Sequence, residues 1–318
     1  MIKIIDYDHS VGLAHGLEDG KNFVIKGNIA LNDINFTAYN FNTLFDHKIG
    51  EVNYDDMDMF VACPDFGNKI GRRGSSNFSL DDLNICLGII SLKIPDYILI
   101  AVSQSAITYL QIENRVTETY DGIPTNDLVI GKLKEMGYTS QFFIIDPVTY
   151  RLPQHKVAGF YFATKNDLFD NPIKLPEGSY NKKESSTCRW LSGIDGKTLN
   201  FHNPDWSKKE ICEKIKPGSN AKRTKDVSVT SGYIRLRPDM PAPNLGSEFY
   251  KVSASTPSIH PVYDRPLTLR EGALLSGLLN EYTWDPKTKK SDVAKQIELS
   301  VSPIIGNKIR EGLLNVFG

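Results

Sequence analysis

The feature that most constrains the fold is an alternation, over the first half of the chain, between short apolar runs and helix-like patterns. The runs are typical of buried strands, and the segments between them repeat apolar residues at helical spacing. Strands that alternate with helices predict a mostly parallel sheet with helices on both faces, which is an α/β fold. The predicted strands are residues 1–6, 22–27, 58–63, 97–103, 141–146 and 159–164, and the predicted helices are residues 10–20, 79–95 and 125–137.

The pattern over residues 79–95 is the clearest of the helices. Ser79 can cap its first turn, and Pro95 marks its end. The apolar side chains that share one face are Leu80, Leu83, Leu87 and Ile90.

Three polar or reactive residues fall at the carboxyl ends of predicted strands: Asp6, Cys63 and Ser103. In sheets of this type, ligands bind beyond the carboxyl ends of the strands. We therefore expect the functional site at this edge. Cys63, in the stretch VACPDFG, has two interpretations at this point: a nucleophile, or a small buried thiol that ends a strand.

The four cysteines are scattered, and none stands in a C-x-x-C pair. Neither a zinc site nor a disulfide framework is indicated, and a reducing cytoplasm fits best. The sequence has no run of about 18 apolar residues, and it opens on a strand rather than on a basic and apolar leader. We therefore expect an intracellular protein without a membrane segment.

The composition changes between residues 165 and 258, which are polar and rich in Asn, Ser, Pro and Gly. This region is predicted to be a second, irregular domain or a long insertion. Residues 179–225 hold eleven Lys or Arg and five Asp or Glu, a charge of +6 in a chain of net charge -1. A local basic segment suits contact with phosphates, although solvated lysine-rich loops are the simpler interpretation. A compact helix over 270–284 and a last segment, capped by Asp292 and ending as an amphipathic helix, complete the chain.

The C-terminal third carries two motifs that resemble the DNA cytosine-5 methyltransferase family. The family has an R-x-L-T-x-R-E-x-A helix followed by a K-Q-I-G-N-x-V-P-P segment. The first motif is matched by Arg265, Leu267, Thr268, Arg270, Glu271 and Ala273. The second is matched by Lys295, Gln296, Ile297, Val301 and Pro303, with Glu298 and Leu299 in place of the family's Gly-Asn. The two matches in the right order are more specific than either alone.

Two earlier segments extend the resemblance over nearly the whole chain. IIDYDHSVGLAHGLEDG looks like the family's D-x-F-x-G-x-G-G motif, and LPQHKVAGFYFAT looks like its G-V-P-Q-x-R-x-R motif. The resemblance implies a Rossmann-like methyltransferase sheet with a smaller, irregular target-recognition domain. The expected boundaries are 1–165 plus 291–318 for the methyltransferase-like domain and 166–290 for the DNA-binding domain.

The resemblance also implies where S-adenosylmethionine would bind. Asp6, Ser10, Gly12 and Asn28 stand at the cofactor positions. The family's other glycines are replaced by His9 and Ser10, and the acid after the second strand falls near Asn28 or Ile29. Close backbone approach to a ligand needs glycine, so these replacements reduce the space for the donor.

The catalytic positions are open to two alignments. Against P-P-C-Q-x-F-S, Cys63 is either the nucleophile or part of a segment just before a deleted P-C-Q. The family's E-N-V falls on 101–103, or on Glu113 and Asn114 twelve residues later. Lys156 stands at the family's first Arg position, and Ala158 stands at the second. Lysine lacks the fixed fork of arginine.

The resemblance places DNA contacts on basic side chains of the flexible loop and of the recognition domain. These are Lys69, Arg72, Arg73, Lys182, Lys183, Arg189, Lys222, Arg223, Lys225, Arg235 and Arg237.

Residues that define the fold match the family, whereas residues that define catalysis differ at several separate places. We therefore expect a non-catalytic protein that binds double-stranded DNA or an active methyltransferase subunit, in a bacterial or phage cytoplasm or otherwise with DNA. The alternative is an active, divergent enzyme with Cys63 as nucleophile and S-adenosylmethionine as donor. A third possibility is other chemistry near Asp8, His9 and His15, which have no recognisable metal spacing.

Overall fold

The computed structural model describes residues 1–7, 12–29, 57–64, 69–70, 76–77, 81–102, 125–168, 171–192, 194, 201–224, 232–278, 282 and 284–317. The chain folds into two compact units. Unit 1 comprises Met1–Ile145, Ala158–Pro176 and Ile305–Gly318, and unit 2 comprises Asp146–Val157 and Glu177–Ile304. The recognition role expected of residues 166–290 stays a prediction.

Unit 1 is built on a six-stranded sheet with the order β2-β1-β3-β6-β8-β7. β1, β2, β3 and β6 run parallel, whereas β8 runs antiparallel to both β6 and β7. The strands are β1 (Ile2–Tyr7), β2 (Phe23–Ile29), β3 (Met59–Ala62), β6 (Tyr97–Val102), β7 (Tyr138–Ile145) and β8 (Ala158–Lys165). The predicted α/β fold with a mostly parallel sheet is confirmed.

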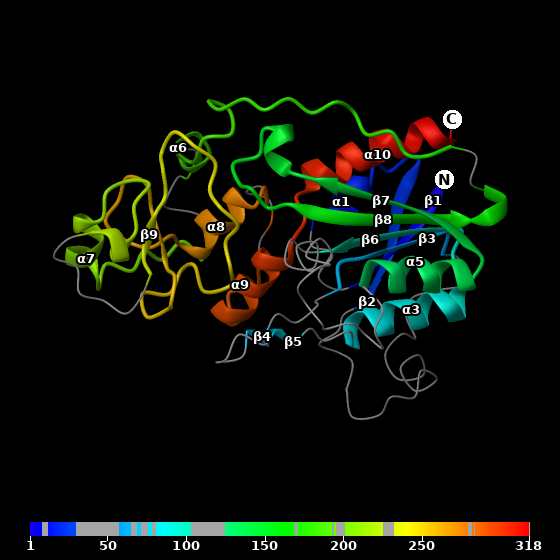
Figure 1. The fold of residues 1–318 in the computed structure, drawn as a ribbon, viewed down its shortest axis with the longest axis horizontal. Helices are drawn as coiled ribbons and strands as arrows, with labels where there is room; N and C mark the ends of the chain where they lie inside the picture. Colours follow the sequence, from blue (N-terminus) through cyan, green and yellow to red (C-terminus); the bar gives the residue numbers. More distant parts are fainter. Residues whose placement is uncertain are drawn as a thin grey trace. The chain divides into compact units, whose positions relative to one another are not determined.

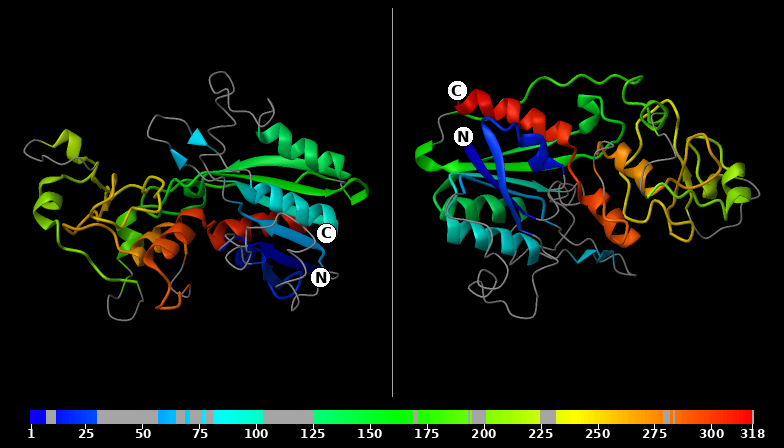
Figure 2. Two further views of the ribbon diagram at one scale, coloured as in Figure 1. Left: turned by 90° about the horizontal axis from the view of Figure 1, so that it is seen from below. Right: turned by 180° about the vertical axis from the view of Figure 1, so that it is seen from behind.

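Helices cover both faces of this sheet. Figures 1 and 2 show α3 and α5 on one face and α1 with α10 on the other. The bounds are α1 (Leu13–Leu17), α3 (Asp81–Lys93), α5 (Thr125–Glu135) and α10 (Pro303–Phe317). Because both faces are covered, every residue of β3 is buried, and so are the last four residues of β1. Among the described residues, this unit also contains β4 (Lys69–Ile70), β5 (Ser76–Asn77) and the 3-10 turn η4 (Asn166–Leu168).

Two of the predicted helices end as the sequence indicates. In α3, Leu83, Leu87 and Ile90 are buried, and the helix stops just before the Ile94-Pro95 pair. In α5, Gly137 follows the last turn with φ 84° and donates its N–H to Lys134 O at 3.0 Å. Glycine suits this position because it adopts a left-handed conformation without steric cost.

Unit 2 is mostly irregular and is held by short elements. They are η3 (Pro147–Tyr150), α6 (Thr187–Leu191), α7 (Lys209–Lys214), η5 (Ala221–Arg223), β9 (Ile234–Arg235), β10 (Ser258–Ile259), α8 (Leu269–Leu275) and α9 (Lys290–Leu299). A small core is formed by Cys212, Ile215, Ala221, Tyr233 and Ile259. The prediction of an irregular region agrees with this architecture.

Two details of the C-terminal helices were predicted wrongly. The helix expected over 270–284 ends at Leu275, because Gly277 takes φ 75° and turns the chain. Asp292 is not a cap, since α9 begins at Lys290 and Asp292 lies in its first turn. Within the part of the chain that the structure describes, no helix is long and apolar enough to cross a membrane.

Candidate functional site

The carboxyl edge of β1 and β3 is the place where the sheet topology favours a ligand. The chain passes from β1 to β2 on one side and later to β3 on the other, so the strand order reverses at β1. Such a reversal leaves a crevice beyond the strand ends. Asp6 is paired in register with Asn28 of β2 and with Val61 of β3, and Cys63 follows β3 by one residue. The fold therefore brings the predicted residues Asp6, Asn28 and Cys63 to one edge.

Of the three predicted residues at this edge, the two whose side chains are described are closed to solvent. Asp6 and Cys63 are each 4% exposed. A carboxylate or a thiol that acts on a ligand needs access to it, and burial of this degree is typical of a thiol that packs as a small apolar group. The position of Cys63 agrees with the nucleophile prediction, while its burial agrees with the strand-end interpretation.

The helix that follows β1, α1, packs against α10. Gly12, at the start of α1, has φ 98°, which only glycine adopts readily. A Cβ atom on Gly306 of α10 would lie 2.4 Å from Leu13 O, so α10 packs directly on the α1 backbone. Arg310 adds a hydrogen bond from Nη1 to Glu18 O at 2.7 Å. These contacts hold α1 in place. They also hold Gly12, which ends the segment predicted to bind S-adenosylmethionine.

Several predicted residues lie outside the described residues: Ser10, Arg72, Arg73, Ser103, Glu113 and Lys225. For Lys69 and Asn28 the backbone is placed in β4 and β2, respectively. Their functions stay predictions.

Lys156 belongs to unit 2, where its ammonium group stabilises the end of α9. Nζ donates to Ile297 O at 2.6 Å and to Ser300 Oγ at 3.1 Å. Ser300 is the C-cap residue of α9. A cation near a helix C-terminus satisfies carbonyls that have no partner within the helix. The side chain thus has a structural function that its sequence position did not reveal.

The neighbouring Gln154 is also part of the unit 2 interior. It is 1% exposed, donates from Nε2 to Pro243 O at 3.2 Å, and accepts from Ser276 Oγ at 3.2 Å. The L-P-Q-H-K segment therefore ties the chain around residue 154 to the end of α8.

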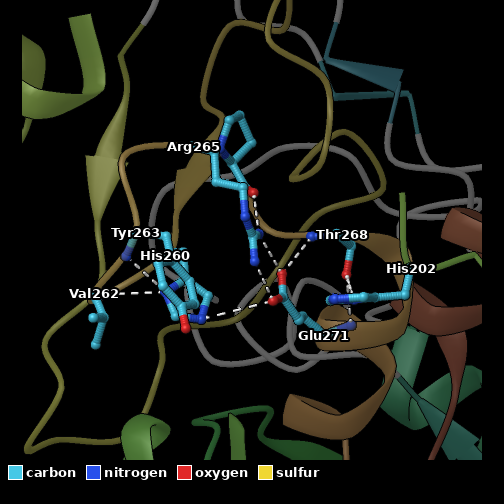
Figure 3. A network of polar contacts seen from close by, with 8 residues as sticks. His202, His260, Val262, Tyr263, Arg265, Thr268 and Glu271 are labelled. Atoms are coloured by element: carbon cyan, nitrogen blue, oxygen red, sulfur yellow. Dashed lines mark hydrogen bonds and ion pairs between the residues drawn. The ribbon is translucent and has the colours of Figure 1, made fainter. Parts of the chain in front are cut away.

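The motif R-x-L-T-x-R-E-x-A forms a buried polar cluster at the start of α8 (Figure 3). Thr268 is the N-cap, and Thr268 and Glu271 form a reciprocal capping box. Arg265 donates from both terminal nitrogens to the two oxygens of Glu271, at 2.8 Å each. Burial alone would raise the pKa of Glu271, but hydrogen bonds and charge from Arg265 outweigh it and lower the pKa. The motif is thus the internal framework of this unit.

The second arginine of the motif, Arg270, is fully buried. Its Nη1 donates to Tyr282 O at 2.6 Å, and its guanidinium lies 5.1 Å from the ring centroid of Trp284. Burial lowers the pKa of Arg270. Arg270 therefore fixes the chain after α8.

His260 completes the cluster, and sequence reasoning missed it. Its Nδ1 accepts from the backbone N–H groups of Val262 and Tyr263 at 3.1 and 3.0 Å, and its Nε2 lies 3.7 Å from Glu271 (Figure 3). Because Nδ1 accepts two hydrogen bonds, the ring is neutral. Burial lowers the pKa of His260 to about 4, although the charge of Glu271 opposes this shift. No sequence motif marks this histidine.

The described basic residues of unit 2 that were predicted to meet DNA fall into three groups. Arg235 is buried, donates to Cys212 O and forms an ion pair with Asp264, so its guanidinium is used internally. Arg237 and Lys182 both pair with Asp239, whose pKa falls to about 2 because of the hydrogen bonds from Arg237 and Lys182. The remaining exposed cations are Lys183, Arg189, Lys222 and Arg223.

Among the described residues, no group of three or more His, Cys, Asp or Glu side chains is arranged to hold a metal ion. This includes the surroundings of His15. Asp8 and His9 lie outside the described residues.

Comparison with known proteins identifies the family of the chain. A family model described as C-5 cytosine-specific DNA methylase matches residues 109–315. No curated protein matches the sequence.

Solved structures share the fold at low sequence identity. A protein described as a DNA modification methyltransferase encoded within an E. coli prophage superposes with a TM-score of 0.65 at 14% identity, covering 100% of this chain and 99% of that chain. A mutant of Spodoptera frugiperda DNMT2 gives 0.59 at 16% identity and covers 100% of both chains. Entamoeba histolytica methyltransferase EhMeth gives 0.57 at 12% identity, with 100% and 99% coverage. The fold is that of methyltransferases, and the chain belongs to the C-5 cytosine-specific DNA methylase family.

Proposed function

We propose that this chain is a DNA-binding member of the family that does not itself transfer a methyl group. The observation that carries the proposal is a contrast between the two units. In unit 2, the motif residues Arg265, Thr268 and Glu271 form a buried polar cluster at the start of α8. In unit 1, the side chains described at the predicted reaction edge, Asp6 and Cys63, are closed to solvent.

The methyl donor used by this family, S-adenosylmethionine, fits the described residues poorly. Asp6 is 4% exposed, and the position that would supply an acid for the ribose hydroxyls falls on Asn28 or Ile29. An alkyl side chain accepts no hydrogen bond, and an amide offers one uncharged acceptor oxygen where a carboxylate offers two charged ones.

The family match supports the same assignment. It begins at residue 109 and so covers unit 2, but it does not reach Asp6 or Cys63. Lys156, at a position where the family carries a base-binding arginine, is engaged with α9. Each of these observations favours a role in binding over one in catalysis.

DNA contact is assigned to the exposed cations of unit 2, chiefly Lys183, Arg189, Lys222 and Arg223. Phosphate contacts of this type give affinity that falls steeply with salt. A regulatory function beside an active methyltransferase subunit would use the same DNA contacts.

A second candidate function rests on the shared edge of Asp6 and Cys63. Asp6 of β1 pairs with Val61 of β3, so Cys63, just after β3, lies near the point where the strand order reverses. Ligands bind at such points, so a nucleophile there could reach a substrate. In this alternative the chain is an active cytosine-5 methyltransferase, with Cys63 as nucleophile, Glu113 on the base, and the donor on Asp6, Ser10, Gly12 and Asn28.

Binding and transfer are tested together with the purified chain, mixed-sequence duplex DNA and radiolabelled donor. We expect salt-sensitive binding without transfer. The double variant K222A/R223A should lower the slope of log K against log salt by about two, because each lost phosphate contact removes about one. Lys134→Ala, which removes an exposed lysine of α5, is the control and should leave the slope unchanged.

Methyl transfer that Cys63→Ala abolishes and Cys86→Ala preserves would overturn the proposal in favour of the active enzyme. Cys86 is a matched control because it is a buried thiol of unit 1 that lies in α3. Absence of any DNA binding would overturn both candidates.

A further inference from the structure

A hollow in unit 2 is lined by none of the residues that the family motifs assign to catalysis or to the donor. Its volume is about 210 Å³, and it is bordered by residues 201–205, residues 250–253, the start of α8 and the first residue of α9. Drug-sized ligands usually occupy roughly 300–1,000 Å³, so this hollow suits a smaller group, such as one aromatic ring system.

Two aromatic residues, Phe201 and Tyr250, line the hollow. Phe201 has φ 62°, a left-handed conformation that is rare for a bulky residue. Its carbonyl accepts from Arg270 N at 3.4 Å, and its ring meets Trp284 edge-on at 6.1 Å. The fold thus holds an aromatic side chain at the hollow in a conformation that costs stability, and such strain is typical of functional positions.

The charged groups around the hollow are two lysines and one aspartate. Lys251 pairs with Glu248 at 3.2 Å, whereas Lys290 lies within ion-pair distance of no described carboxylate, although its charge acts on Asp205. Backbone and side-chain hydrogen bonds from Ser207 lower the pKa of Asp205, and the charge of Lys290 adds to this effect. At the border of the hollow, the ammonium group of Lys290 can bind an anion, and the carboxylate of Asp205 can accept a hydrogen bond from an N–H group.

We propose that this hollow binds a single nucleotide, with the base against Phe201 and Tyr250 and the phosphate on Lys290. Aromatic rings stack on any base, and a lysine provides a point charge for phosphate. Asp205 accepts a hydrogen bond from an exocyclic amine, so the site prefers cytosine over uracil. The nucleotide is either free or one unit of a single strand, and the site is independent of the proposed methylation-related function.

The test is calorimetric titration of the full chain with CMP, UMP, cytidine and inorganic phosphate. We expect CMP to bind at one site and to bind more tightly than the other three. Phe201→Gly removes the ring while keeping the left-handed backbone, and Lys290→Ala removes the phosphate partner. Each should weaken CMP binding at least tenfold. Lys287→Ala, an exposed lysine just before α9, should leave it unchanged.

A further arm uses a short oligocytidine strand. CMP binding that depends on Phe201 and Lys290 assigns the site to free nucleotides. Strand binding with the same dependence, but without CMP binding, assigns it to a nucleotide within a strand. The proposal is overturned if neither ligand binds at millimolar concentration, if UMP binds as well as CMP, or if binding survives both variants. Duplex DNA binding is measured on the same samples, so failure here is distinct from failure of the proposed function.

Discussion

At the residue scale, Glu271 connects more of unit 2 than its place in a sequence motif suggests. Its carboxylate receives both terminal nitrogens of Arg265 and the backbone N–H of Thr268, and it faces His260. All of these groups are buried. Removal of one partner of such a pair leaves an uncompensated charge in the interior, which costs more than the pair contributes over an apolar replacement.

We therefore expect Arg265→Met to destabilise unit 2 by about 3–5 kcal/mol, because Glu271 remains buried without its main partner. Urea unfolding followed by tryptophan fluorescence measures this change. All three tryptophans (Trp190, Trp206 and Trp284) lie in unit 2, so the signal reports on that unit.

The matched control is Lys182→Met, which breaks the exposed pair with Asp239. Exposed pairs contribute little to stability because water screens them, so this variant should unfold almost like the wild type. Equal effects of the two substitutions would show that the buried cluster does not stabilise the unit.

His260 gives unit 2 a specific response to acid. Its folded pKa of about 4 lies below the ordinary 6.5, so the unfolded chain takes up this proton first as the pH falls. The contribution to stability is complete above pH 6.5 and is lost progressively as the pH falls towards 4. The full loss is on the order of 3 kcal/mol, because each pKa unit corresponds to about 1.4 kcal/mol.

Fluorescence-detected unfolding at about pH 7, 6, 5 and 4 measures this loss. The groups that face His260 are Glu271, Arg265, Arg235 and His202. His260→Asn offers an acceptor that does not titrate, so its stability should vary less between pH 6.5 and 4 than that of the wild type. Parallel profiles for the two proteins would contradict the assignment.

At the element scale, the close contact between α10 and α1 holds in place the helix that follows β1. The Cβ of an alanine at position 306 would lie 2.4 Å from Leu13 O, a backbone atom that cannot move alone. We expect Gly306→Ala to destabilise unit 1 by about 1–3 kcal/mol through overpacking, although alanine favours a helix.

Gly131→Ala in α5 is the control, because no atom lies within 4 Å of the place that the new methyl group would occupy. It should stabilise the protein by roughly 0.5–1 kcal/mol. Far-UV circular dichroism melting compares the two variants. A stabilising Gly306→Ala substitution would show that α10 and α1 are farther apart than described.

The contact between Lys156 and α9 gives a second prediction at this scale. Lys156→Met removes the ammonium donor from Ile297 O, which keeps its hydrogen bond from Ser300 Oγ at 2.8 Å, so unit 2 should lose about 0.5–1.5 kcal/mol while DNA binding stays the same. His155→Ala, next to it in sequence and exposed, is the control. If stability is unchanged and DNA binding is weaker, Lys156 contacts the base, as the resemblance implies, and does not stabilise α9.

Local sequence patterns predicted the regular elements well and the buried polar groups poorly. β6 and β8 were placed to within one residue, because their apolar runs are buried on both faces and are bounded by polar residues. The end of α8 was missed, since the turn at Gly277 depends on its φ of 75° and not on the apolar pattern that continues beyond it. Hydrophobic periodicity predicts which face of a helix is buried, but it does not predict where the helix ends.

At the scale of the whole molecule, the two units carry the family resemblance in different ways. In unit 2 the motif residues are internal, as the pairing of Arg265 with Glu271 shows. The resemblance predicted Arg235 as a DNA contact because its segment matches the family's recognition face, yet its partner Asp264 lies 29 residues away. The exposure of an arginine depends on such distant partners, which explains why a segment match did not separate surface arginines from buried ones.

Calorimetric titration of the purified chain with S-adenosylmethionine tests the central claim most directly, because it needs no assumption about the DNA target or a partner. We predict no saturable heat up to hundreds of micromolar donor, since Asp6 is closed and the second strand ends without an acid. Low-micromolar binding at one site, lost in Asp6→Ala but kept in Asp19→Ala on the loop before β2, would contradict this prediction and favour the active enzyme.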